Sequence, residues 1–157
     1  MSDTGRRYDD SWLVVPLYNE ATVIGQVIDD AKQSFPNIVC IDDGSSDDSA
    51  EIASNHGARV INHPFNLGQG AALQTGMEYV RRHTNANYIV TFDADGQHSV
   101  ADAAAMVDRA RAEDLAIIFG SRFLDAATKV GWAKKLVLKT AAAVTKARTG
   151  VNLTDAH

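Results

Sequence analysis

Two aspartates, Asp93 and Asp95, directly follow an apolar run in the second half of the chain. The run, residues 88–92, is β-branched and aromatic, which is typical of a buried strand. Two carboxylates so close together repel one another and are costly to bury unpaired. Mg²⁺ and Mn²⁺ take oxygen ligands, often one or two carboxylates together with substrate phosphates. Because Asp and Gly are also common turn residues, this stretch alone leaves open both a divalent-cation site and a solvated turn.

The hydrophobic pattern predicts the elements that would position this pair. Apolar runs predict strands at 12–17, 38–41, 58–61, 88–92 and 115–119, with Pro16 ending the first strand. Helical spacing between them predicts four helices, with Ser46 or Asp47 as the N-cap of the second and Ser99 as that of the fourth. Strands that alternate with helices over short connections predict an α/β fold, a mostly parallel sheet flanked by helices.

Polar clusters follow four of the predicted strands, at the point where each strand ends. They lie at residues 18–20, 42–45, 93–95 and 120–122. In an open parallel sheet, ligands bind outside the carboxyl ends of the strands. One such cluster is compatible with a simple turn, but four at a single edge predict a binding site there.

A nucleoside diphosphate is the kind of ligand that these clusters fit. Besides a cation it needs acceptors for the base and ribose, which Asp42 or Asp43 can supply. Gly68 and Gly70 precede a predicted helix, where missing side chains let backbone amides approach an anion. Arg122 can pair with a phosphate. Each feature also has an ordinary structural explanation: a capped helix start at 42–49, turn glycines and a surface ion pair.

Composition and missing motifs exclude several other classes. The 157 residues suit one domain, and the net charge of −5 gives no reason to expect nucleic acid as a partner. Cys40 is the single cysteine, which excludes an internal disulfide, and its place in an apolar run disfavours a nucleophilic role. The chain has no P-loop and no GxGxxG after its first strand, and its histidines lack zinc-ligand spacing. The sequence leaves open whether His98 is a further metal ligand, a substrate contact or a surface residue.

Five segments, in this order, resemble the motifs of family 2 glycosyltransferases. The resemblance is greatest to the polyprenyl-phosphate branch, which includes dolichyl-phosphate mannose synthases, and it extends from about residue 12 to the end. The segments are VPLYNE (15–20), IDDGSSD (41–47), NLGQGAA (66–72), FDADGQH (92–98) and GSR (120–122).

The resemblance implies a GT-A type, Rossmann-like fold and inverting transfer from a UDP- or GDP-sugar. It implies that Asp93 and Asp95 bind Mg²⁺ or Mn²⁺, and that the catalytic residues are Asp155, as base, with Asp95 and with Arg122 near the phosphates. It assigns base and ribose recognition to Pro16, Tyr18, Glu20, Asp42 and Asp43. The remaining residues that it places in the nucleotide-sugar site are Asn19, Gly44, Ser45, Asn66, Gly68, Gly70, Ala94 and Gln97.

The sequence departs from the family pattern at two places, one near the phosphates of the nucleotide-sugar and one in the part of the site that binds the acceptor. Gln69 stands where many members carry Lys or Arg. The Gly-Phe-Arg segment that follows the acidic position in this branch is absent, because the chain ends at His157. We therefore expect residues 1–157 to form a single nucleotide-sugar-binding catalytic domain that is truncated at its C-terminal end.

Residues 129–148 carry six basic side chains and no acidic one, with apolar residues at helical spacing. This pattern predicts a basic amphipathic helix that lies on an anionic membrane surface, or that packs on the sheet or on a partner chain. The resemblance favours the membrane-surface helix. It also implies a cytoplasmic protein at the inner face of the membrane with a lipid-phosphate acceptor. A homo-oligomer is a further possibility that the sequence leaves open. The alternative functions are a sugar nucleotidyltransferase and a catalytically silent nucleotide-sugar-binding module.

Overall fold

The computed structural model describes residues 7–96 and 99–120. The chain divides into two compact units, Met1–Ala116 and Ile117–His157, and all the described helices and strands belong to the first. Several predictions fall outside the described residues: those on Gln97, His98, Arg122, Asp155 and the basic segment 129–148.

Strands and helices alternate along the first unit. The strands are β1 (Ser11–Leu17), β2 (Asn37–Asp42), β3 (Arg59–Asn62) and β4 (Tyr88–Thr91). The helices are α1 (Ile24–Lys32), α2 (Ser49–Asn55), α3 (Gln69–His83) and α4 (Val100–Glu113). These are the first four strands and the four helices that the hydrophobic pattern predicts, which confirms the α/β class.

The four strands form one parallel sheet in the order β3-β2-β1-β4. The order reverses at β1, which has β2 on one side and β4 on the other, so the loops after β1 and β4 lie at the switch point where ligands bind in such sheets. Pro16 lies inside β1, beyond Val14, where the pairing with β4 stops. The N–H that proline lacks would point toward the β4 side, so no bond of the ladder is lost there.

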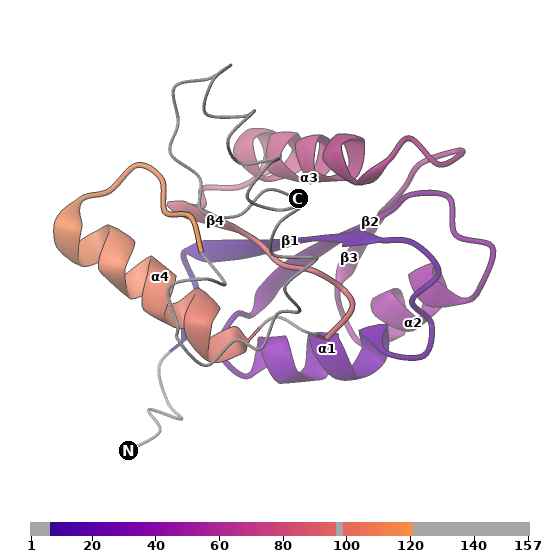
Figure 1. Ribbon diagram of the computed structural model, residues 1–157, viewed down its shortest axis with the longest axis horizontal. Coiled ribbons are helices and arrows are strands. Elements are labelled where there is room, and N and C mark those ends of the chain that lie inside the picture. The colour runs from indigo at the N-terminus through magenta and orange to yellow at the C-terminus, as the bar shows by residue number, and fades with distance from the viewer. Residues whose placement is uncertain (1–6, 97–98, 121–157) are drawn as a thin grey trace, which may run out of the picture. The chain divides into compact units, whose positions relative to one another are not determined.

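Helices cover both faces of the sheet. Figure 1 shows α3 alone above the sheet and α1, α2 and α4 below it. The two faces bury separate apolar clusters, since successive side chains of a strand point to opposite faces. Leu13, Val15 and Cys40 belong to the larger cluster, with α1 and α4, whereas Val14 and Val39 belong to the cluster under α3.

Gly76 lets α3 approach the sheet closely. It is buried in the middle of α3, and a Cβ there would overlap Val14 Cγ1 and lie 3.2 Å from Ile41 Cγ1. The backbone of α3 therefore rests on β1 and β2 without an intervening side chain. This contact fixes the height of α3, and with it the position of its N-terminal residue Gln69, above the sheet.

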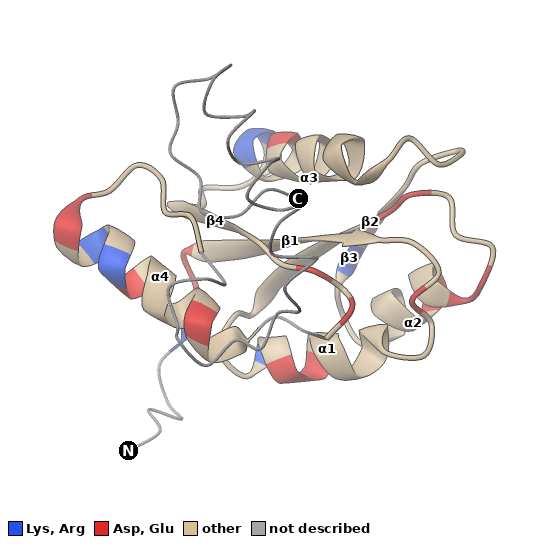
Figure 2. Ribbon diagram, viewed as in Figure 1, with Lys and Arg blue, Asp and Glu red and all other residues tan. Residues whose placement is uncertain are grey.

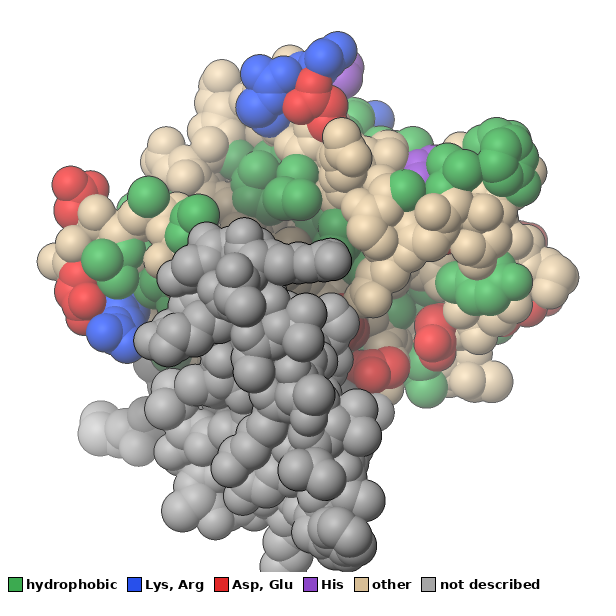
Figure 3. Space-filling model, turned by 45° about the horizontal axis from the view of Figure 1, so that its top comes forward, with side chains coloured by type: hydrophobic (Ala, Val, Ile, Leu, Met, Phe, Trp, Pro, Cys, Tyr) green, Lys and Arg blue, Asp and Glu red, His purple; other side chains and the backbone are tan. Residues whose placement is uncertain are grey.

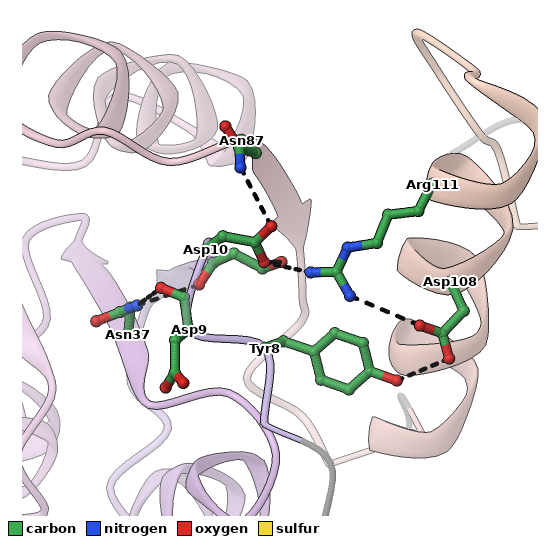
Figure 4. Close-up of polar contacts among 8 residues, drawn as sticks. Tyr8, Asp9, Asp10, Asn37, Asn87, Asp108 and Arg111 are labelled. Atoms are coloured by element: carbon green, nitrogen blue, oxygen red, sulfur yellow. Dashed lines mark hydrogen bonds and ion pairs between the residues drawn. The ribbon is translucent and has the colours of Figure 1, made fainter.

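A polar cluster joins α4 to the edge of the sheet where the strands begin, opposite their carboxyl ends (Figure 4). The guanidinium of Arg111 lies 5.3 Å from the ring centroid of Tyr8 and 5.2 Å from that of Tyr88, and it pairs with Asp10. The Tyr8 hydroxyl donates to Asp108 Oδ2 at 2.9 Å. Cation–π and ion-pair contacts therefore dock the C-terminal part of α4 at the edge where the strands begin.

The structure confirms one of the two predicted helix caps and corrects the other. Ser99 caps α4 as predicted, and its side chain accepts from the N–H of Asp102 at 3.3 Å. The N-cap of α2 is Asp48, not Ser46 or Asp47, but the Asp47 carboxylate still accepts from the N–H of Ser49 at 3.0 Å. Asp48 itself makes no side-chain capping bond, so the residue before the N-cap supplies the acceptor for the first turn of α2.

The predicted fifth strand, at residues 115–119, is wrong. The structure describes these residues outside any strand, and the side chains of Ile117 and Phe119 are 70% and 69% exposed. A β-branched run forms a strand only where a neighbour takes its backbone hydrogen bonds. None of the described strands pairs with this run. Separately, none of the described helices combines the length and hydrophobicity that crossing a membrane requires.

Candidate functional site

The loops after β1 and β2 are joined by hydrogen bonds at the carboxyl edge of the sheet. Asn19, with φ of 55°, donates its N–H to Ser45 Oγ at 2.9 Å, and its Oδ1 accepts from the N–H of Ser46 at 2.8 Å. One residue on, the N–H of Glu20 donates to Ser49 Oγ at 2.8 Å. The side chain of Asn19 therefore has a structural partner, whereas Tyr18 beside it is 49% exposed.

Asp42 and Asp43 are both buried at the end of β2, but their carboxylates differ in what they contact. Asp42 Oδ2 accepts from the N–H of Ser45 at 3.3 Å, whereas its Oδ1 is buried without a hydrogen-bond partner among the described residues. Asp43 accepts from the backbone N–H groups of Leu67 and Gly68, at 2.9 Å and 2.7 Å. A buried carboxylate oxygen without a donor is costly, and Asp42 presents one next to the carboxyl edge.

Asp43 also binds His63, the first residue after β3. His63 Nδ1 lies 2.7 Å from Asp43 Oδ1, and its Nε2 lies 2.9 Å from Thr75 Oγ1 on α3. Burial raises the pKa of the Asp43 carboxyl, but the hydrogen bonds from Leu67, His63 and Gly68 outweigh it, so that the pKa is lowered from its ordinary value. Asp43 is therefore ionised at neutral pH, and because it can only accept, His63 Nδ1 carries a proton.

Glycines shape the loop that leads into α3. Gly44 has φ of 76°, and a Cβ there would lie 2.9 Å from the backbone nitrogen of Asn66, so only glycine lets these two loops pack. Gly68 has φ of 94°, and a Cβ at Gly68 or Gly70 would meet nothing within 4 Å. The start of α3 is thus open, as the sequence prediction of an anion-accessible backbone requires.

The two candidate metal ligands follow β4. Asp93 is partly buried, Ala94 is buried and Asp95 is exposed, in a turn closed by Gly96 at φ of 74°. Gln69, the first residue of α3, donates from Nε2 to Asp93 Oδ1 at 3.3 Å. The described residues hold no group of three or more His, Cys, Asp or Glu side chains placed for a metal ion. Two carboxylates nevertheless fit a cation whose remaining ligands are substrate phosphates.

Among the described residues, Lys and Arg are confined to one edge of the sheet, whereas Asp and Glu occur at both edges (Figure 2). These basic residues lie in the last turns of helices, before β1 or at the first position of β3, on the edge where the strands begin; they are Arg7, Lys32, Arg59, Arg81, Arg82, Arg109 and Arg111. The loops at the carboxyl edge carry acids instead: Glu20, Asp42, Asp43, Asp47, Asp48, Asp93 and Asp95. The described part of this edge therefore supplies no cationic side chain for a diphosphate.

Large apolar side chains are also exposed near this edge. Figure 3 shows hydrophobic groups on the right of the molecule, over the loops that follow the strands. Phe65 and Leu67, in the loop between β3 and α3, are 63% and 50% exposed. Sequence reasoning did not single out this pair, nor His63. A signal for His63 is nevertheless present in the sequence, because it is a polar residue directly after a strand, like the polar clusters at 18–20, 42–45 and 93–95.

The chain resembles known proteins over most of its length. The model of glycosyl transferase family 2 matches residues 12–154. A UDP-N-acetylglucosamine–dolichyl-phosphate N-acetylglucosaminyltransferase of Methanococcus voltae is 30% identical, over 71% of this chain and 51% of that protein. A polyprenol monophosphomannose synthase of Mycolicibacterium smegmatis is also 30% identical, over 91% of this chain and 57% of that protein.

The chain thus spans about half the length of these curated relatives. Among solved structures, a glucosyl-3-phosphoglycerate synthase of Mycobacterium tuberculosis, crystallised with Mn²⁺, UDP and glucosyl-3-phosphoglycerate, aligns with a TM-score of 0.46. It is 28% identical, over 57% of this chain and 34% of that chain. From the family match over residues 12–154 it follows that the chain belongs to glycosyl transferase family 2.

Proposed function

We propose that this chain binds a UDP- or GDP-sugar at the carboxyl edge of its sheet, together with Mg²⁺ or Mn²⁺. The domain is then the donor-binding part of an inverting glycosyltransferase whose acceptor is a polyprenyl phosphate. The observation that carries the proposal is Asp42 Oδ1, a buried carboxylate oxygen without a hydrogen-bond donor among the described residues.

Asp42 is suited to a nucleotide base. Its Oδ2 is held by the N–H of Ser45, which fixes the carboxylate and leaves Oδ1 to accept from a ligand. An imide or amide N–H of uracil or guanine is such a donor. The exposed ring of Tyr18, directly after β1, offers a flat apolar surface in the neighbouring loop.

The charge of the edge supports a divalent cation as part of the donor complex. A diphosphate is anionic, and the described residues of this edge are acidic. Asp93 and Asp95 would hold the cation, which when bound supplies positive charge to the diphosphate and stabilises the leaving nucleotide. Gln69 orients Asp93 through its amide, and Arg122 is proposed, from the family resemblance, to lie near the phosphates.

The acceptor is proposed from the relatives. One relative is named for transfer of N-acetylglucosamine to dolichyl phosphate and another for synthesis of polyprenol monophosphomannose. A lipid phosphate is already anionic and needs little deprotonation, so Asp155 would position the acceptor more than it would remove a proton. Because such an acceptor lies in a membrane, we propose that the protein acts at the inner face of the membrane, with the basic segment 129–148 on the membrane surface.

Calorimetric titration with UDP and GDP, each with and without Mn²⁺, tests the donor site. Asp95→Ala is expected to weaken Mn²⁺-dependent nucleotide binding by tenfold or more and to change the free energy of unfolding by less than about 1 kcal/mol, because Asp95 is exposed. Asp30→Ala, which removes an exposed carboxylate of α1, is the control and should change neither. Equal Mn²⁺-dependent affinity of Asp95→Ala and the unmodified chain would contradict the metal assignment.

Turnover separates the transferase from a silent nucleotide-sugar-binding module. Transfer of radiolabelled sugar to a polyprenyl phosphate by the full-length gene product is expected for the transferase alone. Asp155→Asn should lower this transfer and leave nucleotide binding unchanged. Nucleotide-sugar binding without transfer to any polyprenyl phosphate would favour the silent module.

A further inference from the structure

Three side chains, two of them buried, form a hydrogen-bonded chain behind the candidate donor site. Asp43 at the end of β2, His63 after β3 and Thr75 on α3 are joined at 2.7 Å and 2.9 Å, and we call them the Asp43 clamp. The side chains of Asp43 and His63 are only 4% and 8% exposed. Buried ionisable groups need partners, and these three supply one another.

The clamp fixes the backbone of the loop before α3. Both carboxylate oxygens of Asp43 accept from this loop: Oδ1 from the N–H of Leu67 at 2.9 Å, and Oδ2 from the N–H of Gly68 at 2.7 Å. His63 adds a backbone bond to the same strand end, from its N–H to the carbonyl of Asp42 at 2.8 Å. Asp43 therefore faces its own chain with both oxygens, unlike Asp42, which keeps Oδ1 without a partner.

The fixed loop ends where the candidate metal site begins. Gly68 is the N-cap of α3, and the next residue, Gln69, donates to Asp93 Oδ1. The position of Gly68 therefore sets where the amide of Gln69 can reach. Through this short path the end of β2, which carries Asp42, is connected to the carboxylate of Asp93.

We propose that Asp43, His63 and Thr75 are positioning residues that hold the loop 66–69 so that Gln69 orients Asp93 for the metal–diphosphate complex. This inference rests on the proposed function. It differs from the role that the family resemblance implies for Asp43, because Asp43 then acts through the loop and does not touch the nucleotide. Partners that orient a metal ligand are typically worth tenfold to a hundredfold in metal affinity.

The test combines amide hydrogen exchange of the free protein with calorimetric titration of Mn²⁺ and UDP or GDP. His63→Leu removes both side-chain bonds at similar volume, and Thr75→Val removes one of them with an isosteric side chain. Both variants should speed exchange of the Leu67 and Gly68 amides and weaken Mn²⁺-dependent nucleotide binding, by about tenfold or more for His63→Leu. The control is His56→Leu, because His56, the C-cap of α2, also binds an aspartate, Asp29 of α1 at 2.9 Å, and makes no contact with the clamp residues among the hydrogen bonds of the described chain.

A conservative variant separates positioning from general stability. His63→Asn keeps an N–H donor where Nδ1 lies and should restore most of the amide protection and nucleotide affinity, while its missing bond to Thr75 still lowers stability. If His63→Leu does not fold, Thr75→Val, which removes the bond to His63 Nε2, serves as the test.

Each outcome is decisive. Faster exchange at Leu67 and Gly68 with unchanged nucleotide affinity, or unchanged values of both, would overturn the positioning role while leaving the proposed function intact. If the unmodified chain binds neither UDP nor GDP with Mn²⁺, the proposed function itself fails and this inference falls with it.

Discussion

Replacing Asp42 by asparagine should change binding and stability in opposite directions. Asp42 is 6% exposed, and its Oδ1 has no hydrogen-bond partner among the described residues, while Oδ2 accepts from Ser45. Asp42→Asn keeps the shape and an oxygen for Ser45 but replaces a buried, under-partnered charge by a neutral amide. Because a buried charge without a donor is costly, the free energy of unfolding should stay the same or rise, by up to about 1 kcal/mol.

Nucleotide binding should weaken in the same variant. A hydrogen bond to a charged acceptor is worth about 1.5–3 kcal/mol, and about 1.4 kcal/mol corresponds to tenfold in affinity. The dissociation constant for UDP or GDP with Mn²⁺ should therefore rise by roughly tenfold to a hundredfold, since the amide N–H₂ that replaces Oδ1 cannot accept from a base. Calorimetric titration gives the affinity and urea unfolding gives the stability.

Two results would refute this reasoning. Unchanged nucleotide affinity would show that Asp42 Oδ1 does not face the ligand. A loss of more than about 1 kcal/mol in unfolding free energy would show that the charge of Asp42 supports the fold instead. Asp30→Asn, at an exposed position of α1, is the matched control and should alter neither quantity.

Three further predictions concern the close helix contact, the metal side and acid stability. Gly76→Ala should lower the unfolding free energy by about 1–2 kcal/mol in urea, because its Cβ overlaps Val14 and overpacking outweighs the gain in helix propensity. Gln69→Leu should weaken Mn²⁺ binding in the presence of UDP several-fold in calorimetry, because it removes the hydrogen bond that orients Asp93. The lowered pKa of Asp43 means that its stabilisation is present above the unfolded value of about 4 and is lost as the pH falls further. Asp43→Asn should therefore flatten the pH dependence of urea unfolding between about pH 5 and about pH 2.

The order of the elements could be predicted because it follows from local pattern. Each of β1 to β4 is an apolar run, and each helix shows its own spacing or cap, as Ser99 does for α4. The edge of the sheet that carries the candidate site also follows from topology alone, since parallel strands end on the same side. The run at 115–119 has the same local pattern but no paired neighbour among the described strands, and strand pairing is not encoded locally.

The sequence could not predict that Asp43 binds the loop before α3 while Asp42 keeps an oxygen without a partner among the described residues. Both are aspartates at the end of one strand, and what separates them is a loop that returns more than 20 residues later to place the Leu67 and Gly68 amides on Asp43. The contact between Gln69 and Asp93 has the same origin, because it joins two elements that meet only through the fold. Side-chain roles of this kind depend on contacts between residues far apart in the sequence, and residue types and local spacing do not reveal such contacts.

The strand order has a consequence for how the chain folds as it is synthesised. β1 emerges first and occupies the interior of the sheet, yet it gains β4 only after residue 91 has been made. Until then one side of an apolar strand carries backbone groups that are not yet paired, and such an edge readily pairs with other chains. Contacts between segments this far apart also form slowly. Nascent chains that stop before Tyr88 should therefore aggregate or bind chaperones, whereas chains that include β4 should not.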